Sequence, residues 1–165
     1  MNPMKKIRIE KITLNIGCGS TMNPENAKSI LEMITEKKAV ITHSKKRSTF
    51  GVPKNRPIGC KVTLRKDVED MLKRLLEAKE NMLRKTSFDS TGNFSFGIKE
   101  YIDVPGTDYD PKIGMVGFDV AVTLERPGYR VKRRKLPNKL GKSHMISKEE
   151  AIDFVAERFN VKIEE

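Results

Sequence analysis

The strongest constraint on the fold is a period-two alternation of apolar and polar residues, which recurs in four stretches of the chain. Such alternation is typical of strands that bury one face and expose the other. The apolar positions are Ile12, Leu14 and Ile16; Ile58, Cys60, Val62 and Leu64; Phe94, Phe96 and Ile98; and Phe118, Val120, Val122 and Leu124. Half-buried strands of this kind predict an antiparallel sheet that is covered on one side.

Three other stretches carry apolar residues at helical spacing. Asn23–Pro24 supplies an N-cap and a first helical residue, and this helix should end near Glu36. Asp67 is expected to cap a long second helix whose inner stripe runs over 68–83. The sequence SKEE at 147–150 is a capping box that opens the third helix.

Together with a short strand at 39–42, these stretches give the order β, α, β, β, α, β, β, α. That order predicts an α+β fold, a mostly antiparallel sheet with helices packed on one face and the other face open. We expect one domain over 1–165, with a basic loop and a C-terminal helix at 126–165. The open face would present polar and cationic groups and no acidic ones, namely Lys11, Thr13, Asn15, Lys61, Thr63 and Arg65.

The positive charge of the chain is concentrated in two tracts. The net charge is +11, yet residues 37–66 hold ten Lys or Arg and residues 126–148 hold nine, with no Asp or Glu in either tract. The rest of the chain carries 14 basic and 22 acidic residues, a net charge of −8. Two cationic tracts in an otherwise acidic chain indicate a polyanionic partner.

Several protein classes are disfavoured by the sequence. The chain has no apolar run near 18 residues, so we expect no membrane span, and MNPMKKIRIEK lacks the apolar region of a secretion signal. Cys18 and Cys60 form neither a disulfide framework nor a metal cluster. We expect both to be buried thiols in a cytoplasmic protein.

The turn Gly17-Cys18-Gly19 resembles the cofactor loop of small-molecule methyltransferases. Such an enzyme needs a carboxylate about 20 residues further on to bind the ribose hydroxyls. The region KKAVITHSKK has none, and the chain is short for a doubly wound domain. The glycines would otherwise simply turn the chain, or the turn and Asn15 would contact an RNA backbone. An RNA-modifying methyltransferase remains the alternative function.

No stretch of the sequence combines a nucleophile, a base and an oxyanion site, so we expect no enzyme, no cofactor and no metal centre. His43 and His144 lie in the basic tracts, where contact with RNA or solvent is the commoner role. Asp103, Asp108 and Asp110 lie in a long loop over 103–117 without EF-hand spacing. Either a cation or a basic partner would suit these three carboxylates.

Each basic tract contains one aromatic residue, Phe50 in the first and Tyr129 in the second. An exposed aromatic among cations can stack on an unpaired base while the cations bind phosphates. Phe50 packed back on its own loop is an equal alternative. The charge lies on strands and loops rather than on a helix, which favours structured RNA over duplex DNA.

Long ordered motifs over nearly the whole chain resemble one family. They are KITLNIGCG, RPIGCKVTLR, SFDSTGNFSFGIKEYIDVPGTDYDPKIGMVGFDVAVTLERPGYR and SKEEAIDF. They resemble the universal large-subunit ribosomal protein that binds 5S rRNA, protein five of the bacterial series. The tract over 126–145 and the helix after it resemble the archaeal and eukaryotic branch.

The resemblance implies a non-enzymatic scaffold in the cytoplasmic large ribosomal subunit, which attaches 5S rRNA in the central protuberance among other proteins and large-subunit rRNA. The resemblance carries rRNA-binding roles over to Asn15, Lys37, Phe50 and Thr63. The open face and the first basic tract add the other predicted rRNA-binding residues, which are Lys11, Thr13, Lys45, Lys46, Arg47, Lys61 and Arg65. Lys37 replaces a Gln of the bacterial pattern, which favours a phosphate contact over a base contact. The second basic tract adds Arg130, Lys132, Arg133, Arg134 and Lys135.

Two loops are implied to reach beyond the large subunit. The loop tip near the elbow of P-site tRNA corresponds to Gly51, Val52, Pro53, Lys54, Asn55 and Arg56. The long loop with Asp103, Asp108 and Asp110 is implied to meet small-subunit protein thirteen across an intersubunit bridge.

Overall fold

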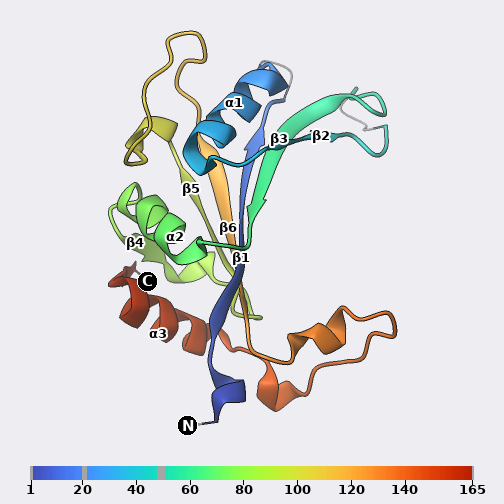
Figure 1. Cartoon of the computed structure of the whole chain (residues 1–165), viewed down its shortest axis with the longest axis vertical. Helices are drawn as coiled ribbons and strands as arrows, with labels where there is room; N and C mark the ends of the chain where they lie inside the picture. The colour runs from blue at the N-terminus through green and yellow to red at the C-terminus, as the bar shows by residue number, and fades with distance from the viewer. Residues whose placement is uncertain (1, 20–21, 48–50, 165) are drawn as a thin grey trace.

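The computed structural model describes residues 2–19, 22–47 and 51–164. Five strands form an antiparallel sheet in the order β2-β3-β1-β6-β5 (Figure 1). The strands are β1 (Arg8–Gly17), β2 (Val40–His43), β3 (Pro57–Leu64), β5 (Phe94–Ile98) and β6 (Phe118–Glu125). The helices are α1 (Pro24–Thr35), α2 (Val68–Glu77) and α3 (Lys148–Phe159). The predicted α+β class is therefore confirmed.

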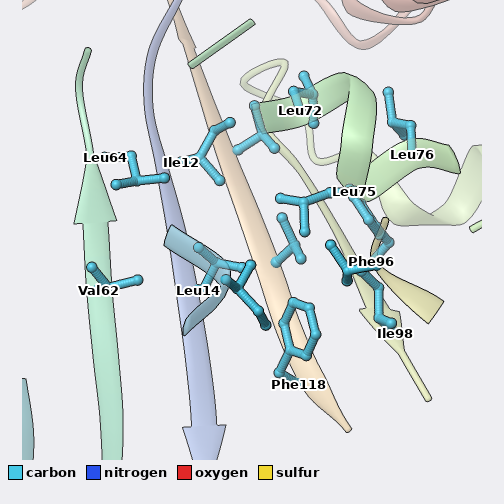
Figure 2. Close-up of a cluster of buried hydrophobic side chains, with 14 of the residues drawn as sticks. Ile12, Leu14, Val62, Leu64, Leu72, Leu75, Leu76, Phe96, Ile98 and Phe118 are labelled. Atoms are coloured by element: carbon cyan, nitrogen blue, oxygen red, sulfur yellow. The ribbon is translucent and has the colours of Figure 1, made fainter. Parts of the chain in front are cut away.

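One face of the sheet is buried under helices. Ile12 and Leu14 of β1 and Val62 and Leu64 of β3 project to the side of the sheet on which α2 lies and join one buried hydrophobic cluster with its leucines (Figure 2). Leu72, at the same contact, has no exposed surface. The alternating positions of the strands lie on the opposite face and are largely exposed. The period-two pattern therefore predicted correctly which face is covered.

Helix α1 begins and ends where the sequence indicates. The side chain of Asn23 accepts a hydrogen bond from the backbone N–H of Glu25, and Pro24 is the first helical residue. Glu36 ends the helix in a left-handed conformation, with φ of 53°. Helix α3 opens on the predicted capping box, in which Ser147 and Glu150 each accept a hydrogen bond from the other's backbone N–H.

The second helix starts after Asp67, as predicted, but it lacks the expected capping bond and ends earlier than predicted. Asp67 has a left-handed backbone and makes no capping hydrogen bond through its side chain. Helix α2 stops at Glu77, and the chain then turns through Glu80 and Asn81, both with positive φ. Met82 lies in β4 (Met82–Arg84), which pairs in parallel with β7 (Lys162–Glu164). No pattern in the sequence indicated this small second sheet.

None of the helices in the described ranges is long and apolar enough to cross a membrane.

Candidate nucleic-acid interface

The open face brings the predicted polar residues of β1 and β3 together. Thr13 pairs with Thr63 and Asn15 pairs with Lys61 across the two central strands. Asn15, Lys61 and Thr63 are exposed, and Thr13 is half-buried. Lys11 and Arg65 continue the same face at one end of these strands. Six predicted binding residues therefore form one contiguous surface.

The rest of this face is flat because it carries small side chains. Ala121 and Ser95 follow Thr13 across β6 and β5, and Gly97 pairs with Asp119. A Cβ atom added to Gly17 would meet no atom within 4 Å. A polynucleotide backbone can therefore approach the peptide groups of the sheet closely, as shape-based recognition of RNA requires.

The expectation that this face carries no acidic group was wrong. Asp119 stands beside Asn15 in the register of β1 and β6, and its side chain is exposed. Glu125 occupies an open-face position at the end of β6. Both residues lie outside the two cationic tracts, so the charge count could not place them on this surface.

The first basic loop extends the hairpin formed by β2 and β3. Ser44 and Arg56 remain paired, since the Ser44 N–H donates to the Arg56 carbonyl at 2.9 Å. The Asn55 N–H donates to the Ser44 carbonyl at 2.9 Å. Lys45, Lys46, Arg47, Lys54 and Arg56 are all exposed. Phe50 lies outside the described residues, so both of its predicted roles, stacking on a base and packing on its own loop, stay predictions.

Lys37 does not lie with the open-face residues. It follows the C-terminal end of α1 and lines a groove with Lys66 and Arg74, close to the start of α2. The structure therefore separates this cation from the sheet positions with which the sequence analysis grouped it.

The first residues of the second basic tract are held in place by hydrogen bonds to the segment before α3. Arg126 is 5% exposed; it donates to the Met145 carbonyl at 3.2 Å and to a Glu150 carboxylate oxygen at 2.8 Å. Hydrogen bonds from the Ser147 backbone and then from Arg126 lower the pKa of Glu150. A ring nitrogen of His144 lies 2.8 Å from the Pro127 carbonyl.

The interpretation of Tyr129 as a free, exposed aromatic was wrong. The ring is half-buried, and its hydroxyl donates to the His144 carbonyl at 3.2 Å and accepts from the Ile146 N–H at 3.1 Å. Tyr129 therefore closes the base of the second tract. His144 likewise contacts Pro127 within the protein.

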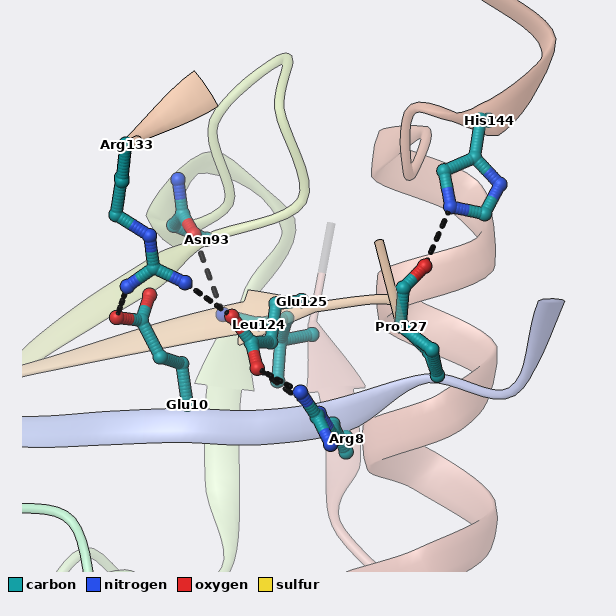
Figure 3. A network of polar contacts seen from close by, with 8 residues as sticks. All are labelled: Arg8, Glu10, Asn93, Leu124, Glu125, Pro127, Arg133 and His144. Atoms are coloured by element: carbon teal, nitrogen blue, oxygen red, sulfur yellow. Dashed lines mark hydrogen bonds and ion pairs between the residues drawn. The ribbon is translucent and has the colours of Figure 1, made fainter. Parts of the chain in front are cut away.

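Arg133 is held by carboxylates on the strands (Figure 3). It donates to Glu10 and, at 2.6 Å, to Glu125. Glu125 also accepts from Arg8 at 2.5 Å and 2.9 Å. Arg130, Lys132, Arg134 and Lys135 are exposed. The five predicted cations of this tract thus divide into one paired arginine and four exposed side chains.

The long loop after β5 is ordered by Tyr101, which has no exposed surface. Its hydroxyl accepts from the Asp110 N–H at 2.9 Å, and its own N–H donates to the Val116 carbonyl at 3.0 Å. Asp103 and Asp108 are exposed and Asp110 is half-buried. In the described ranges, no group of three or more His, Cys, Asp or Glu is arranged to hold a metal ion.

The Gly-Cys-Gly turn continues the pairing of β1 with β3 where β1 ends. The Cys18 N–H donates to the Ile58 carbonyl at 2.9 Å, and Gly19 has a φ of 54°. Cys18 and Cys60 are buried, as predicted, and burial raises the pKa of both thiols. Because the main sheet is antiparallel throughout, the doubly wound fold of the methyltransferase alternative has no support.

Comparison with known proteins decides the family. A model of ribosomal protein L5 matches residues 2–52, and a second model, which describes the C-terminus of the same ribosomal family, matches residues 57–155. The chain belongs to the ribosomal protein L5 family. Archaeal members called large ribosomal subunit protein uL5 are similar along almost their whole length.

Three of these uL5 proteins illustrate the similarity. The Methanosphaera stadtmanae protein is 44% identical over 99% of this chain and 100% of its own length. The Sulfurisphaera tokodaii protein is 47% identical over 100% of this chain and 96% of its own. The Nitrosopumilus maritimus protein is 45% identical over 98% of this chain and 96% of its own. The chain is thus an L5-family constituent of the large ribosomal subunit, in the cytoplasm, of the archaeal type.

Proposed function

We propose that the chain binds 5S rRNA through the open face of its sheet and helps attach that RNA in the central protuberance of the large subunit. The observation that carries the proposal is that Asn15, Lys61 and Thr63 are exposed, beside the half-buried Thr13, on a sheet face that none of the described helices covers. Lys and Arg release counterions from phosphates, and the amide and hydroxyl groups set the position of the backbone.

The first basic loop supplies the second part of the proposed interface. Lys45, Lys46 and Arg47 extend the RNA surface beyond the end of β2. The loop tip at 51–56 contacts P-site tRNA in this proposal. Gly51 and Asn55 take positive φ there, which turns the chain back toward β3.

The long loop after β5 is proposed to meet small-subunit protein thirteen. Its base is fixed by Tyr101, and Arg74 donates to the Pro105 carbonyl at 2.7 Å. Tyr109 and Met115 of this loop expose 51% and 69% of their surfaces, and the exposed carboxylate of Asp108 precedes Tyr109 in the chain. Exposed apolar groups beside carboxylates suit a basic protein surface.

The test is binding to 5S rRNA across a series of salt concentrations. Charge reversal in the triple variant K45E/K46E/R47E should weaken binding and flatten the plot of log affinity against log salt, because the slope counts neutralised phosphates. Lys73→Glu on α2 is the control, because it reverses a charge in the same direction on the helical side, and it should leave both quantities nearly unchanged. A triple variant with wild-type affinity and slope would exclude these three residues from the interface.

A further inference from the structure

We propose that Glu10 and Glu125 are positioning residues for RNA binding, which act by clamping the second basic tract to the RNA-facing side of the sheet. This inference rests on the proposed function. Carboxylates on such a surface should repel RNA. The contacts that these two residues make inside the protein point to the opposite effect.

The clamp consists of two carboxylates and two arginines. Arg133 bridges Glu10 of β1 and Glu125 of β6 through its two terminal nitrogens, while Arg8 holds the other oxygen of Glu125 (Figure 3). The side chains of Glu10 and Glu125 are 13% and 8% exposed, against 50% for Arg133. The two carboxylates neutralise the two arginines. Because both terminal nitrogens of Arg133 already donate to carboxylates, Arg133 should contribute little to phosphate binding.

The register places this cluster at the open face. Val122 and Leu124 of β6 are buried on the helical side, so Glu125 takes the opposite side of the strand. The pairing of β1 with β6 shifts between Ile9 and Lys11, which leaves Glu10 as the extra residue of a bulge. Bulges redirect side chains, and this one lets Glu10 reach Arg133 beside Glu125.

The clamp should affect the position of the second basic tract more than the free energy of unfolding. Paired charges taken out of water gain little net free energy, because desolvation offsets their attraction. The fixed fork of the Arg133 guanidinium, with one nitrogen on each carboxylate, sets the direction in which the chain leaves the sheet. Together with Tyr129 at the base of the tract, it holds the start of the exposed segment 134–143, which contains Arg134, Lys135, Lys139 and Lys142.

Glu125→Gln distinguishes a positioning role of Glu125 from a simple charge effect on RNA binding. Removing a negative charge from an RNA-binding face should strengthen binding by about two- to threefold if only charge counts. If the clamp positions the tract, the same change should weaken 5S rRNA binding by about tenfold, the equivalent of losing roughly one phosphate contact near 0.1 M salt. Asp119→Asn is the control, because Asp119 lies on the same face and makes no ion pair within the described part of the chain. It should bind more tightly.

Hydrogen exchange of the free protein gives a readout that does not depend on RNA. Glu125→Gln should speed amide exchange over 129–135 and leave the β1–β3 pairing protected, whereas Asp119→Asn should change neither. Glu10→Gln, which keeps the Arg8–Glu125 pair, repeats the test should the first variant fold poorly. Tighter binding by Glu125→Gln, or unchanged exchange over 129–135, would overturn the inference. Failure of the wild-type protein to bind 5S rRNA would instead overturn the proposed function.

Discussion

At the scale of single residues, the open face separates binding from folding. The side chains of Asn15 and Thr63 make no hydrogen bond within the described ranges, and no helix packs on them. Their neighbours Leu14 and Val62 point the other way and are buried. Each strand therefore alternates between residues that stabilise the sheet and residues available to a ligand.

Asn15→Ala and Thr63→Ala should consequently weaken rRNA binding and leave thermal stability nearly intact. A lost hydrogen bond to RNA costs about 1 kcal/mol, or roughly fivefold in affinity. Val62→Ala, one residue away, should lower the free energy of unfolding by about 2 kcal/mol through the cavity that it leaves. Filter binding and thermal denaturation of the three variants test this separation. A large loss of stability in the alanine variants of Asn15 or Thr63 would assign those residues to the fold.

Glu150 links residue chemistry to pH. Hydrogen bonds from Ser147 and Arg126 hold its pKa below the ordinary value of 4.5, so the folded protein binds this proton less readily than the unfolded chain. The resulting stability is present above the unfolded pKa and is lost as the pH falls through the lower, folded value. Urea unfolding at pH 7 and pH 3.5 should show a smaller loss of stability for Glu150→Gln than for the wild type. Equal losses would remove Glu150 from the acid response.

At the scale of elements, periodicity predicted the strands of the main sheet and failed where distant pairing decides. Asn23 and Ser147 correctly predicted the starts of two helices, because a capping bond joins residues that are close in the sequence. Met82 and Leu83 continue the apolar stripe of α2 in phase, yet the chain leaves the helix at Glu77. The backbone N–H of Lys162 donates to the Asn81 carbonyl at 2.8 Å. This contact spans 81 positions of the chain, so no local pattern encodes it.

The pairing of β7 with β4 should therefore stabilise the end of α2. A chain that stops at Val161 loses three residue pairs and leaves Leu83 less covered, which should lower the free energy of unfolding by about 2 kcal/mol. Hydrogen exchange should quicken over 82–84 while 5S rRNA affinity is preserved. Lys162→Ala is the control, because it keeps the backbone pairing and should behave like the wild type. Unchanged exchange in the shortened chain would mean that β4 does not depend on β7.

At the scale of the whole molecule, the exposed loop of the first cationic tract and the second tract lie at opposite ends of one sheet. The first extends the hairpin beside Gly17, where β1 ends, and the second starts after Glu125, which pairs with Arg8 at the start of β1. Ten residues of extended strand separate these ends by roughly 30 Å. The charge count predicted two tracts but not this arrangement, because the order β2-β3-β1-β6-β5 sets it.

The two ends should contribute independently to one RNA complex. Neutralising the first tract in K45Q/K46Q/R47Q and the second in K132Q/R134Q/K135Q should each reduce the salt slope by up to about 0.9 per lost phosphate contact. Because the sites are far apart, the free-energy losses of the combined variant should add within about 0.5 kcal/mol. Titrations of all three variants with 5S rRNA measure this directly, with Lys73→Gln on α2 as the control. A loss confined to the first tract would mean that the second tract does not contribute to 5S rRNA binding.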